Sequence, residues 1–177
     1  MTRAAVLAII VGAMTFGVFP AAAPAAADPP SDAPVAYLIG ACWDPSKPVE
    51  QKPATIVYGC DSSSVMVDMT WTAWDGDGAQ GTGTDDAVEC KPNCAQGSRL
   101  ANPIIVHAWN PLPATDLGCP ADVQFYSDYT VAYPQGVPPW VRPGTSWTDG
   151  VDYVYVDGLP AVHFSGQRPY SCTPLAG

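Results

Sequence analysis

Residues 71–84 (WTAWDGDGAQGTGT) carry carboxylates and glycines in two patterns that could bind a ligand. Asp75-Gly-Asp-Gly offers carboxylate ligands for calcium, and GDGAQG matches the glycine spacing of dinucleotide-binding loops. An EF-hand loop would need Glu at its twelfth position, where the chain has Asp86, and no helical pattern follows Gly81 to receive a pyrophosphate. We therefore predict a strand, an Asp-Gly turn and the start of a second strand. A calcium site of another type stays open, built from Asp75, Asp77, Asp85 and Asp86.

Nucleophilic catalysis has one candidate triad, which Ser146, His163 and Asp149 can form on paper. The GTSWT stretch at 144–148 resembles a nucleophile elbow but ends in Thr where that motif has Gly, and no helix follows it. His163 and the second histidine, His107, lie among apolar residues in strand-like segments, which favours a structural role. A secreted hydrolase that uses residues in 146–163 stays an alternative.

Paired carboxylates beside aromatic side chains could also hydrolyse glycosides. Three carboxylates cluster near Trp147, namely Asp149, Asp152 and Asp157. Strand alternation places Asp152 on the opposite face from Tyr153 and Tyr155, which favours an acidic turn beside a hairpin instead.

Tryptophans are the other side chains of this sequence that could bind a ligand. Trp140 and Trp147 lie in the proline-rich segment 133–147, where prolines preorganise loops and exposed rings stack on sugars or prolines. We predict that these two residues contact a ligand. Trp71 and Trp74 are three residues apart, so a regular strand would place one in the core and the other on the outer face or over a bend.

The N-terminus predicts export. Residues 1–27 have one basic residue, an apolar run and a small-residue exit ending in Ala-Ala-Ala, the pattern of a secretory signal peptide. Residues 28–34 form a flexible lead-in, and 35–177 form a single β domain. Ile39–Cys42 looks like a lipobox, but the polar stretch DPPSDAPVAY separates it from the apolar run. We expect a secreted protein of the cell envelope, without an integral membrane segment after processing.

The composition excludes some partners. The formal net charge is −10, with 17 acidic and seven basic residues, and no run of basic residues occurs. Phosphate contacts need clustered Lys and Arg, so we expect no nucleic-acid partner. No cofactor is expected either.

The cysteines indicate three disulfides, since an exported chain carries an even number of them. The six are Cys42, Cys60, Cys90, Cys94, Cys119 and Cys172. Cys90 with Cys94 is the natural local pair. Cys42 with Cys172 would tie the ends of the domain together and leave Cys60 with Cys119. Zinc is the rival, but C-x3-C has no second pair of suitable spacing.

The remaining pattern is that of strands. Alternating or β-branched segments occur at 55–60, 64–74, 103–109, 122–133, 151–156 and 159–164. Asp157-Gly158 predicts a tight hairpin between the last two, and Pro160 suggests a sheet edge. Twenty prolines and 16 glycines leave no room for a long helix. We predict an all-β fold, a small disulfide-stabilised β-sandwich or barrel.

Residues 55–110 contain four short sequence elements in a fixed order. They are Ile56-Val57 with Cys60, W-x-x-W at 71–74, A-x-G-x-G at 79–83 and C-x-P-x-C-A-x-G at 90–97. In these elements the chain resembles a group of small secreted actinobacterial proteins, mycobacterial or streptomycete-like, of unknown function. The resemblance implies export and family membership, and no chemistry.

Together these observations predict a secreted, non-catalytic binding or cell-envelope-associated module. Its partner would be a cell-wall glycan or another envelope protein. A barrel that holds a small apolar ligand is a further alternative to the hydrolase.

Overall fold

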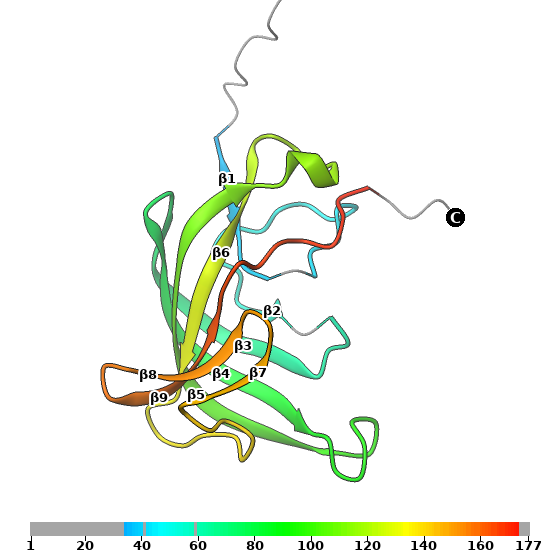
Figure 1. The fold of residues 1–177 in the computed structure, drawn as a ribbon. Helices are drawn as coiled ribbons and strands as arrows, with labels where there is room; N and C mark the ends of the chain where they lie inside the picture. Colours follow the sequence, from blue (N-terminus) through cyan, green and yellow to red (C-terminus); the bar gives the residue numbers. More distant parts are fainter. Residues whose placement is uncertain (1–33, 41, 59, 174–177) are drawn as a thin grey trace, which may run out of the picture. The chain divides into compact units, whose positions relative to one another are not determined.

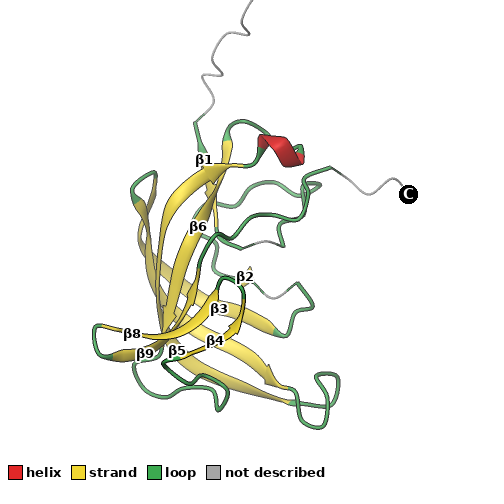
Figure 2. Cartoon of the chain, in the orientation of Figure 1, coloured by secondary structure: helices red, strands yellow, loops and turns green. Residues whose placement is uncertain are grey.

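The structure is a computed structural model that describes residues 34–40, 42–58 and 60–173, and these residues form one curled β-sheet (Figure 1). Its strands are β1 (Ala36–Leu38), β2 (Ile56–Val57), β3 (Ser64–Asp75), β4 (Gly78–Glu89), β5 (Ser98–Pro113), β6 (Val123–Ala132), β7 (Thr145–Thr148), β8 (Val151–Val156) and β9 (Leu159–Phe164). One short 3-10 helix, η1 (Thr115–Leu117), follows β5 (Figure 2). The predicted all-β fold is confirmed. In this part of the chain no helix has the length and apolar character needed to cross a membrane.

The sheet is a half-barrel with two ends. Its strand order is β2-β3-β4-β5-β6-β9-β8-β7, with antiparallel neighbours, and β1 pairs with β6 in parallel. Within the described residues β2 pairs only with β3, and β7 only with β8. The sheet therefore curls without closing, and an open seam separates its β2–β3 end from its β7–β8 end.

Strand β3 turns both tryptophans of the W-x-x-W segment into the core. The pairing of β3 with β4 shifts register between Val67 and Thr70, and again between Trp71 and Ala73. Each shift is a bulge that changes which face the following side chains occupy. The rings of Trp71 and Trp74 consequently meet edge to face, 4.5 Å apart, and both are buried. The prediction that they face opposite sides was wrong, because it assumed a regular strand.

Two glycines of β4 make room for these core side chains. A Cβ on Gly81 would lie 2.6 Å from Cε3 of Trp71 and 2.8 Å from the carbonyl oxygen of Thr70. A Cβ on Gly83 would collide with the sulfur of Met69. The A-x-G-x-G element is therefore a packing requirement, because the β3 side chains lie directly on the β4 backbone.

Gly81→Ala should lower the free energy of unfolding by about 1–3 kcal/mol, since the added methyl group forces the Trp71 indole or the strand to move. Urea unfolding followed by tryptophan fluorescence measures this change. Gly136→Ala is the matched control, because its Cβ would meet only Asn102 Oδ1, at 3.9 Å. Equal stability of the two variants would contradict the packing role of Gly81.

The two predicted turns are present. At the β3–β4 hairpin the Asp75 carboxylate accepts hydrogen bonds from the backbone N–H groups of Asp77 (2.9 Å) and Gly78 (3.3 Å). At the β8–β9 hairpin Asp157 and Gly158 have φ of 51° and 79°, the left-handed values of a tight two-residue turn. The stretch 75–78 is thus a strand-connecting turn.

Pro160 lies in an interior strand, which corrects the prediction of a sheet edge. Strand β9 has β6 on one side and β8 on the other. Pairing of β6 with β9 ends at Ala132 and Ala161, and beyond it the Pro160 carbonyl accepts one bond from Tyr133 N–H (2.9 Å). The missing proline donor thus falls where the ladder ends, so its loss is tolerated.

The disulfides partly follow the prediction. Cys90 pairs with Cys94, as expected. The other two bonds join Cys42 to Cys60 and Cys119 to Cys172, so the predicted pairs Cys42–Cys172 and Cys60–Cys119 were wrong. The reason is that β1 pairs with β6 and the C-terminal segment returns to η1, where Cys172 N–H bonds to the carbonyl oxygen of Leu117 (3.0 Å).

The concave face of the sheet is filled by the chain's own side chains. The main core cluster includes Met66, Trp71, Trp74, Tyr126, Tyr129 and Val131. A smaller cluster surrounds the Cys119–Cys172 bond, with Leu38, Val123 and Phe125. The predicted signal peptide (1–27) and nearly all of the lead-in (28–34) lie outside the described residues. The sulfur of Cys42, the lipobox-like cysteine, is bonded to Cys60.

Candidate functional site

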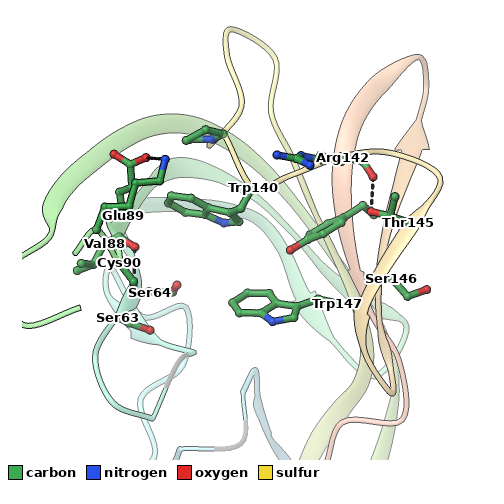
Figure 3. A pocket seen from close by; sticks show the side chains of 13 residues that line it. Ser63, Ser64, Val88, Glu89, Cys90, Trp140, Arg142, Thr145, Ser146 and Trp147 are labelled. Atoms are coloured by element: carbon green, nitrogen blue, oxygen red, sulfur yellow. Dashed lines mark hydrogen bonds and ion pairs between the residues drawn. The ribbon is translucent and has the colours of Figure 1, made fainter. Parts of the chain in front are cut away.

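A cavity of about 710 Å³ lies at the open seam of the sheet (Figure 3). One wall comes from Ser63 and Ser64 at the start of β3 and from residues 88–91 at the end of β4. The other wall comes from the segment before β7, from β7 itself and from Tyr153 of β8. The cavity therefore joins the two ends of the sheet order, which are far apart in sequence.

Both tryptophans predicted to contact a ligand line this cavity. The indoles of Trp140 and Trp147 extend into it from the same wall, with open space between them (Figure 3). Trp147 is 71% exposed although it belongs to a strand. Ser146 also belongs to the lining, but its hydroxyl turns away from the cavity in Figure 3 and donates to Asp152.

The segment between β6 and β7 holds Trp140 in place. Prolines occupy positions 134, 138, 139 and 143, which restrict the backbone. Val141 is buried, and its N–H donates to the carbonyl oxygen of Pro138 (3.0 Å). The Trp140 ring packs partly against the main core cluster. Its position is thus fixed before any ligand arrives.

The opposite wall, formed by the end of β4, carries an ion pair between two of its own residues. The ammonium group of Lys91 lies 2.7 Å from the Glu89 carboxylate. The Cys90–Cys94 bond closes the loop beside it, and a Cβ on Gly97 would collide with the carbonyl oxygen of Glu89. The C-x-P-x-C-A-x-G element is therefore the loop that shapes this wall.

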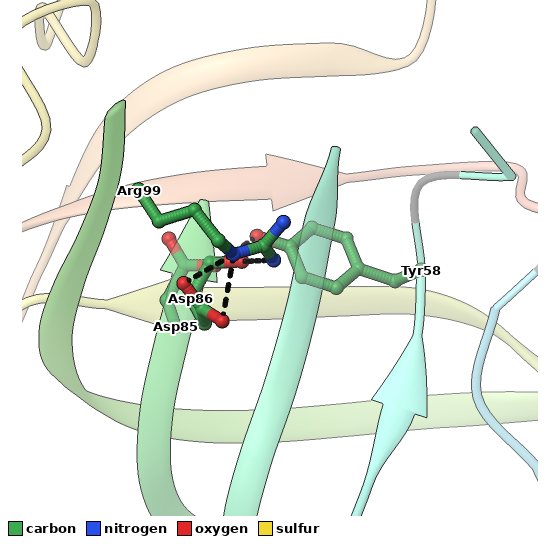
Figure 4. Close-up of polar contacts among 4 residues, drawn as sticks. All are labelled: Tyr58, Asp85, Asp86 and Arg99. Atoms are coloured by element: carbon green, nitrogen blue, oxygen red, sulfur yellow. Dashed lines mark hydrogen bonds and ion pairs between the residues drawn. The ribbon is translucent and has the colours of Figure 1, made fainter. Parts of the chain in front are cut away.

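A buried carboxylate with two tyrosine partners lies behind the cavity. We call Tyr58, Asp85 and Tyr133 the tyrosine–carboxylate cluster. Asp85 is fully buried and accepts hydrogen bonds from Tyr58 Oη (2.7 Å) and Tyr133 Oη (2.9 Å). Its neighbour Asp86 faces the other side of β4 and pairs with Arg99 Nε at 2.8 Å (Figure 4). The cluster thus ties the segment after β2 and the end of β6 to β4.

Burial governs the protonation of this cluster. Desolvation raises the pKa of Asp85, and the hydrogen bonds from the two tyrosines oppose that rise only in part. Desolvation also raises the pKa of Tyr58 and Tyr133 well above the ordinary tyrosine value, and the nearby Asp85 charge adds to it. The hydroxyls therefore stay protonated donors at any physiological pH.

The cluster supports the cavity from behind. Ser64, which lines the cavity, lies against the Tyr58 hydroxyl and slightly lowers its pKa. Tyr153, another lining residue, is close enough to Tyr133 to raise the pKa of that residue further. Tyr133 and the lining residue Tyr153 also belong to the same main core cluster, against which Tyr58 packs, so the tyrosine–carboxylate cluster adjoins the cavity wall formed by Tyr153.

Asp85→Asn should remove a pH dependence of stability. The folded protein binds a proton at Asp85 more tightly than the unfolded chain, whose aspartate pKa is about 3.9. Stability from this group is therefore present below about pH 4 and is lost as pH rises through the folded-state pKa. The Asn variant should gain stability relative to wild type over that rise, which urea unfolding at several pH values measures.

Asp85→Ala is the companion variant for this test. It leaves two tyrosine hydroxyls without a partner and should be about 1–3 kcal/mol less stable than Asp85→Asn at every pH, because neither variant carries the titrating carboxyl. A stability difference between wild type and Asp85→Asn that is constant from acidic to neutral pH would contradict the assignment.

The structure does not assemble the candidate triad. The Ser146 hydroxyl donates to the Asp152 carboxylate, and Asp152 pairs across the strands with His163. The order across the sheet is thus serine, carboxylate, histidine, so no imidazole lies next to the serine as a base. Asp149 is exposed in the β7–β8 turn.

His163 belongs to an aromatic stack on the outer face. Its ring lies 5.5 Å from that of Trp109, which has His107 on its other side at 5.2 Å. His163 Nε2 is 3.9 Å from Asp128, and it has no hydrogen-bond partner among the described residues. Both histidine rings therefore pack against Trp109, which is a structural role.

Two of the three carboxylates considered for glycoside hydrolysis lie far apart. Asp149 and Asp157 lie in the turns at the two ends of β8, six residues long, so about 20 Å of strand separates them. Glycosidase carboxylates need a separation of roughly 5–9.5 Å. Asp152 accepts a hydrogen bond from the Ser146 hydroxyl, while Tyr153 is buried and Tyr155 is exposed.

The four aspartates considered as calcium ligands, Asp75, Asp77, Asp85 and Asp86, do not form a calcium site. Asp75 and Asp77 lie at one end of the β3–β4 hairpin, about 20 Å of strand away from Asp85 and Asp86. Asp85 is bonded to tyrosines and Asp86 to Arg99. Within the described ranges no three His, Cys, Asp or Glu side chains gather as metal ligands do.

Sequence reasoning missed the tyrosine–carboxylate cluster. Its members lie in three separate segments, and each looks ordinary in isolation. One signal was present: Asp85 shares its β4 face with Gly81, Gly83 and Ala87, the small residues that face the core. An aspartate on a core face requires partners, and tyrosines are suitable donors.

Comparison of the chain with protein-family models, with curated proteins and with solved structures finds no match.

Proposed function

We propose that the protein is a secreted, non-catalytic binding module of the cell envelope, which holds a saccharide between Trp140 and Trp147. The observation that carries this proposal is a cavity into which both indoles extend, one of them 71% exposed. Exposing an indole to water is unfavourable, so a strand that keeps one at the mouth of a cavity suggests a ligand that covers it.

The chemistry of the walls fits a sugar. The C–H faces of a pyranose ring stack on indoles, while its hydroxyls need hydrogen-bond partners. Ser63, Ser64 and Thr145 place such partners at the cavity. A volume of about 710 Å³ lies within the range of small-ligand sites. The prolines around Trp140 reduce the entropy that binding would otherwise cost.

The proposed location rests on the sequence and on the disulfides. All six cysteines are paired, a state that persists in oxidising compartments outside the cytosol. The signal-peptide pattern of residues 1–27 and the resemblance to small secreted actinobacterial proteins support the same location.

Two alternatives receive less support. The hydrolase would need a base beside Ser146, and that serine donates to Asp152 instead. A barrel for an apolar molecule would need space on the concave face, which Met66, Trp71, Trp74 and their neighbours occupy. The cavity at the seam is therefore the better place for a ligand.

Trp147→Ala and Trp140→Ala should each weaken binding of soluble oligosaccharides released from purified bacterial cell wall by about tenfold or more, because each removes one stacking surface. Isothermal titration calorimetry of the secreted, oxidised protein measures the affinity.

Tyr170→Ala is the matched control, because Tyr170 is 77% exposed and does not line the cavity. This variant should bind as wild type does. Unchanged affinity of both tryptophan variants, or no binding of any wall fraction by the wild type, would overturn the proposal.

A further inference from the structure

Among the described residues, one cation at the cavity has no carboxylate partner. The described residues contain six Lys and Arg side chains, and four of them lie within 4.0 Å of a carboxylate: Lys47, Lys91, Arg99 and Arg168. Lys52 and Arg142 have no such contact within the described part of the chain. Arg142 lines the cavity, two residues after Trp140 in sequence.

The backbone of Arg142 is fixed while its head group is exposed. Its carbonyl oxygen accepts hydrogen bonds from Thr145 Oγ1 (2.7 Å) and Thr145 N–H (3.2 Å), which close the turn before β7. The preceding residue, Val141, is buried. The side chain extends from this turn on the same wall of the cavity as Trp140 and Trp147, and Figure 3 shows it beside Trp140.

The other charges of the cavity cancel. Glu89 and Lys91 pair with each other at 2.7 Å, so the lining residues carry one net positive charge, that of Arg142. The protein as a whole has a formal net charge of −10. The lining thus offers one guanidinium without a carboxylate partner among the described residues, and it can pair with a single negative charge on a ligand.

We propose that the saccharide held at this site bears a carboxylate, which pairs with the guanidinium of Arg142 while the sugar ring stacks on Trp147 and Trp140. This inference rests on the proposed function. A planar guanidinium matches a carboxylate through two parallel N–H···O bonds. A phosphate dianion or a polyanionic chain fits less well, because Arg142 is the one unpaired charge among the described residues that line the cavity and the acidic protein repels further anions.

Matched ligands test the carboxylate. The disaccharide of N-acetylglucosamine and N-acetylmuramic acid carries one lactyl carboxylate, and its methyl ester is neutral but otherwise identical. A disaccharide of glucuronic acid and N-acetylglucosamine supplies the carboxylate from a uronic acid instead. Calorimetry at low and at physiological salt gives the affinity ratio of acid to ester.

Wild type should bind at least one of the two acids about five- to tenfold more tightly than the methyl ester of the same disaccharide, and the preference should shrink as salt rises. Arg142→Gln should bring the ratio close to one and keep the affinity for the ester. Trp147→Ala should weaken acid and ester alike and keep the ratio. Arg168→Gln removes an arginine that pairs with Asp116, away from the cavity, and should change nothing.

The outcomes separate the two proposals. Equal binding of acid and ester by wild type, or an unchanged ratio in Arg142→Gln, overturns the carboxylate inference while saccharide binding stands. Failure of both acids to bind also overturns it. If the ester and the wall oligosaccharides fail as well, the proposed function falls with it. Thermal unfolding of Arg142→Gln at the wild-type temperature excludes misfolding as the cause.

Discussion

The fold depends on packing two tryptophans, three residues apart in one strand, on the same face of the sheet. Strand alternation would separate Trp71 from Trp74, and bulges in β3 bring them together. The indoles then need space, which β4 provides through the missing side chain of Gly81. Trp71 Nε1 donates to Pro53 O (2.8 Å) and Trp74 Nε1 to Gln51 Oε1 (3.1 Å), so both indoles also hold the segment before β2. Bulges increase twist and bend a strand, which suits a sheet that curls around its aromatic core.

The candidate site is a consequence of that curl. A sheet that curls without closing brings its two ends near each other, and side chains must fill the seam or leave it open. In this protein the inner side of the seam contains Asp85 with its two tyrosines, and the outer side contains the cavity with Trp140 and Trp147. Buried polar groups that are fully bonded are costly to rearrange. The cluster therefore gives the cavity walls a rigid support.

Local patterns predicted most of the strands and both hairpin turns, because alternation and turn chemistry are local properties. They predicted less where the structure of a segment depends on which strands pair with it. The segment 55–60 forms only the two-residue strand β2, and the exposed β7 was expected to be loop. The positions of Trp71 and Trp74 depend on bulges that appear only in the pairing with β4. Two of the three disulfides follow from which strands are neighbours, which cysteine spacing does not contain. For the site, composition identified Trp140 and Trp147. The roles of Asp85 and Arg142 depend on contacts with residues distant in sequence, which local patterns do not reveal.

The most direct test of the central claim is an NMR spectrum of the indole N–H groups of the six tryptophans, recorded during titration with wall oligosaccharides. The signals of Trp140 and Trp147 should shift with ligand, while those of Trp71 and Trp74, whose N–H groups are bonded inside the protein, should stay in place. Unshifted Trp140 and Trp147 signals at saturating ligand, or dominant shifts at Trp109 on the outer face, would contradict the claim that the seam cavity is the binding site.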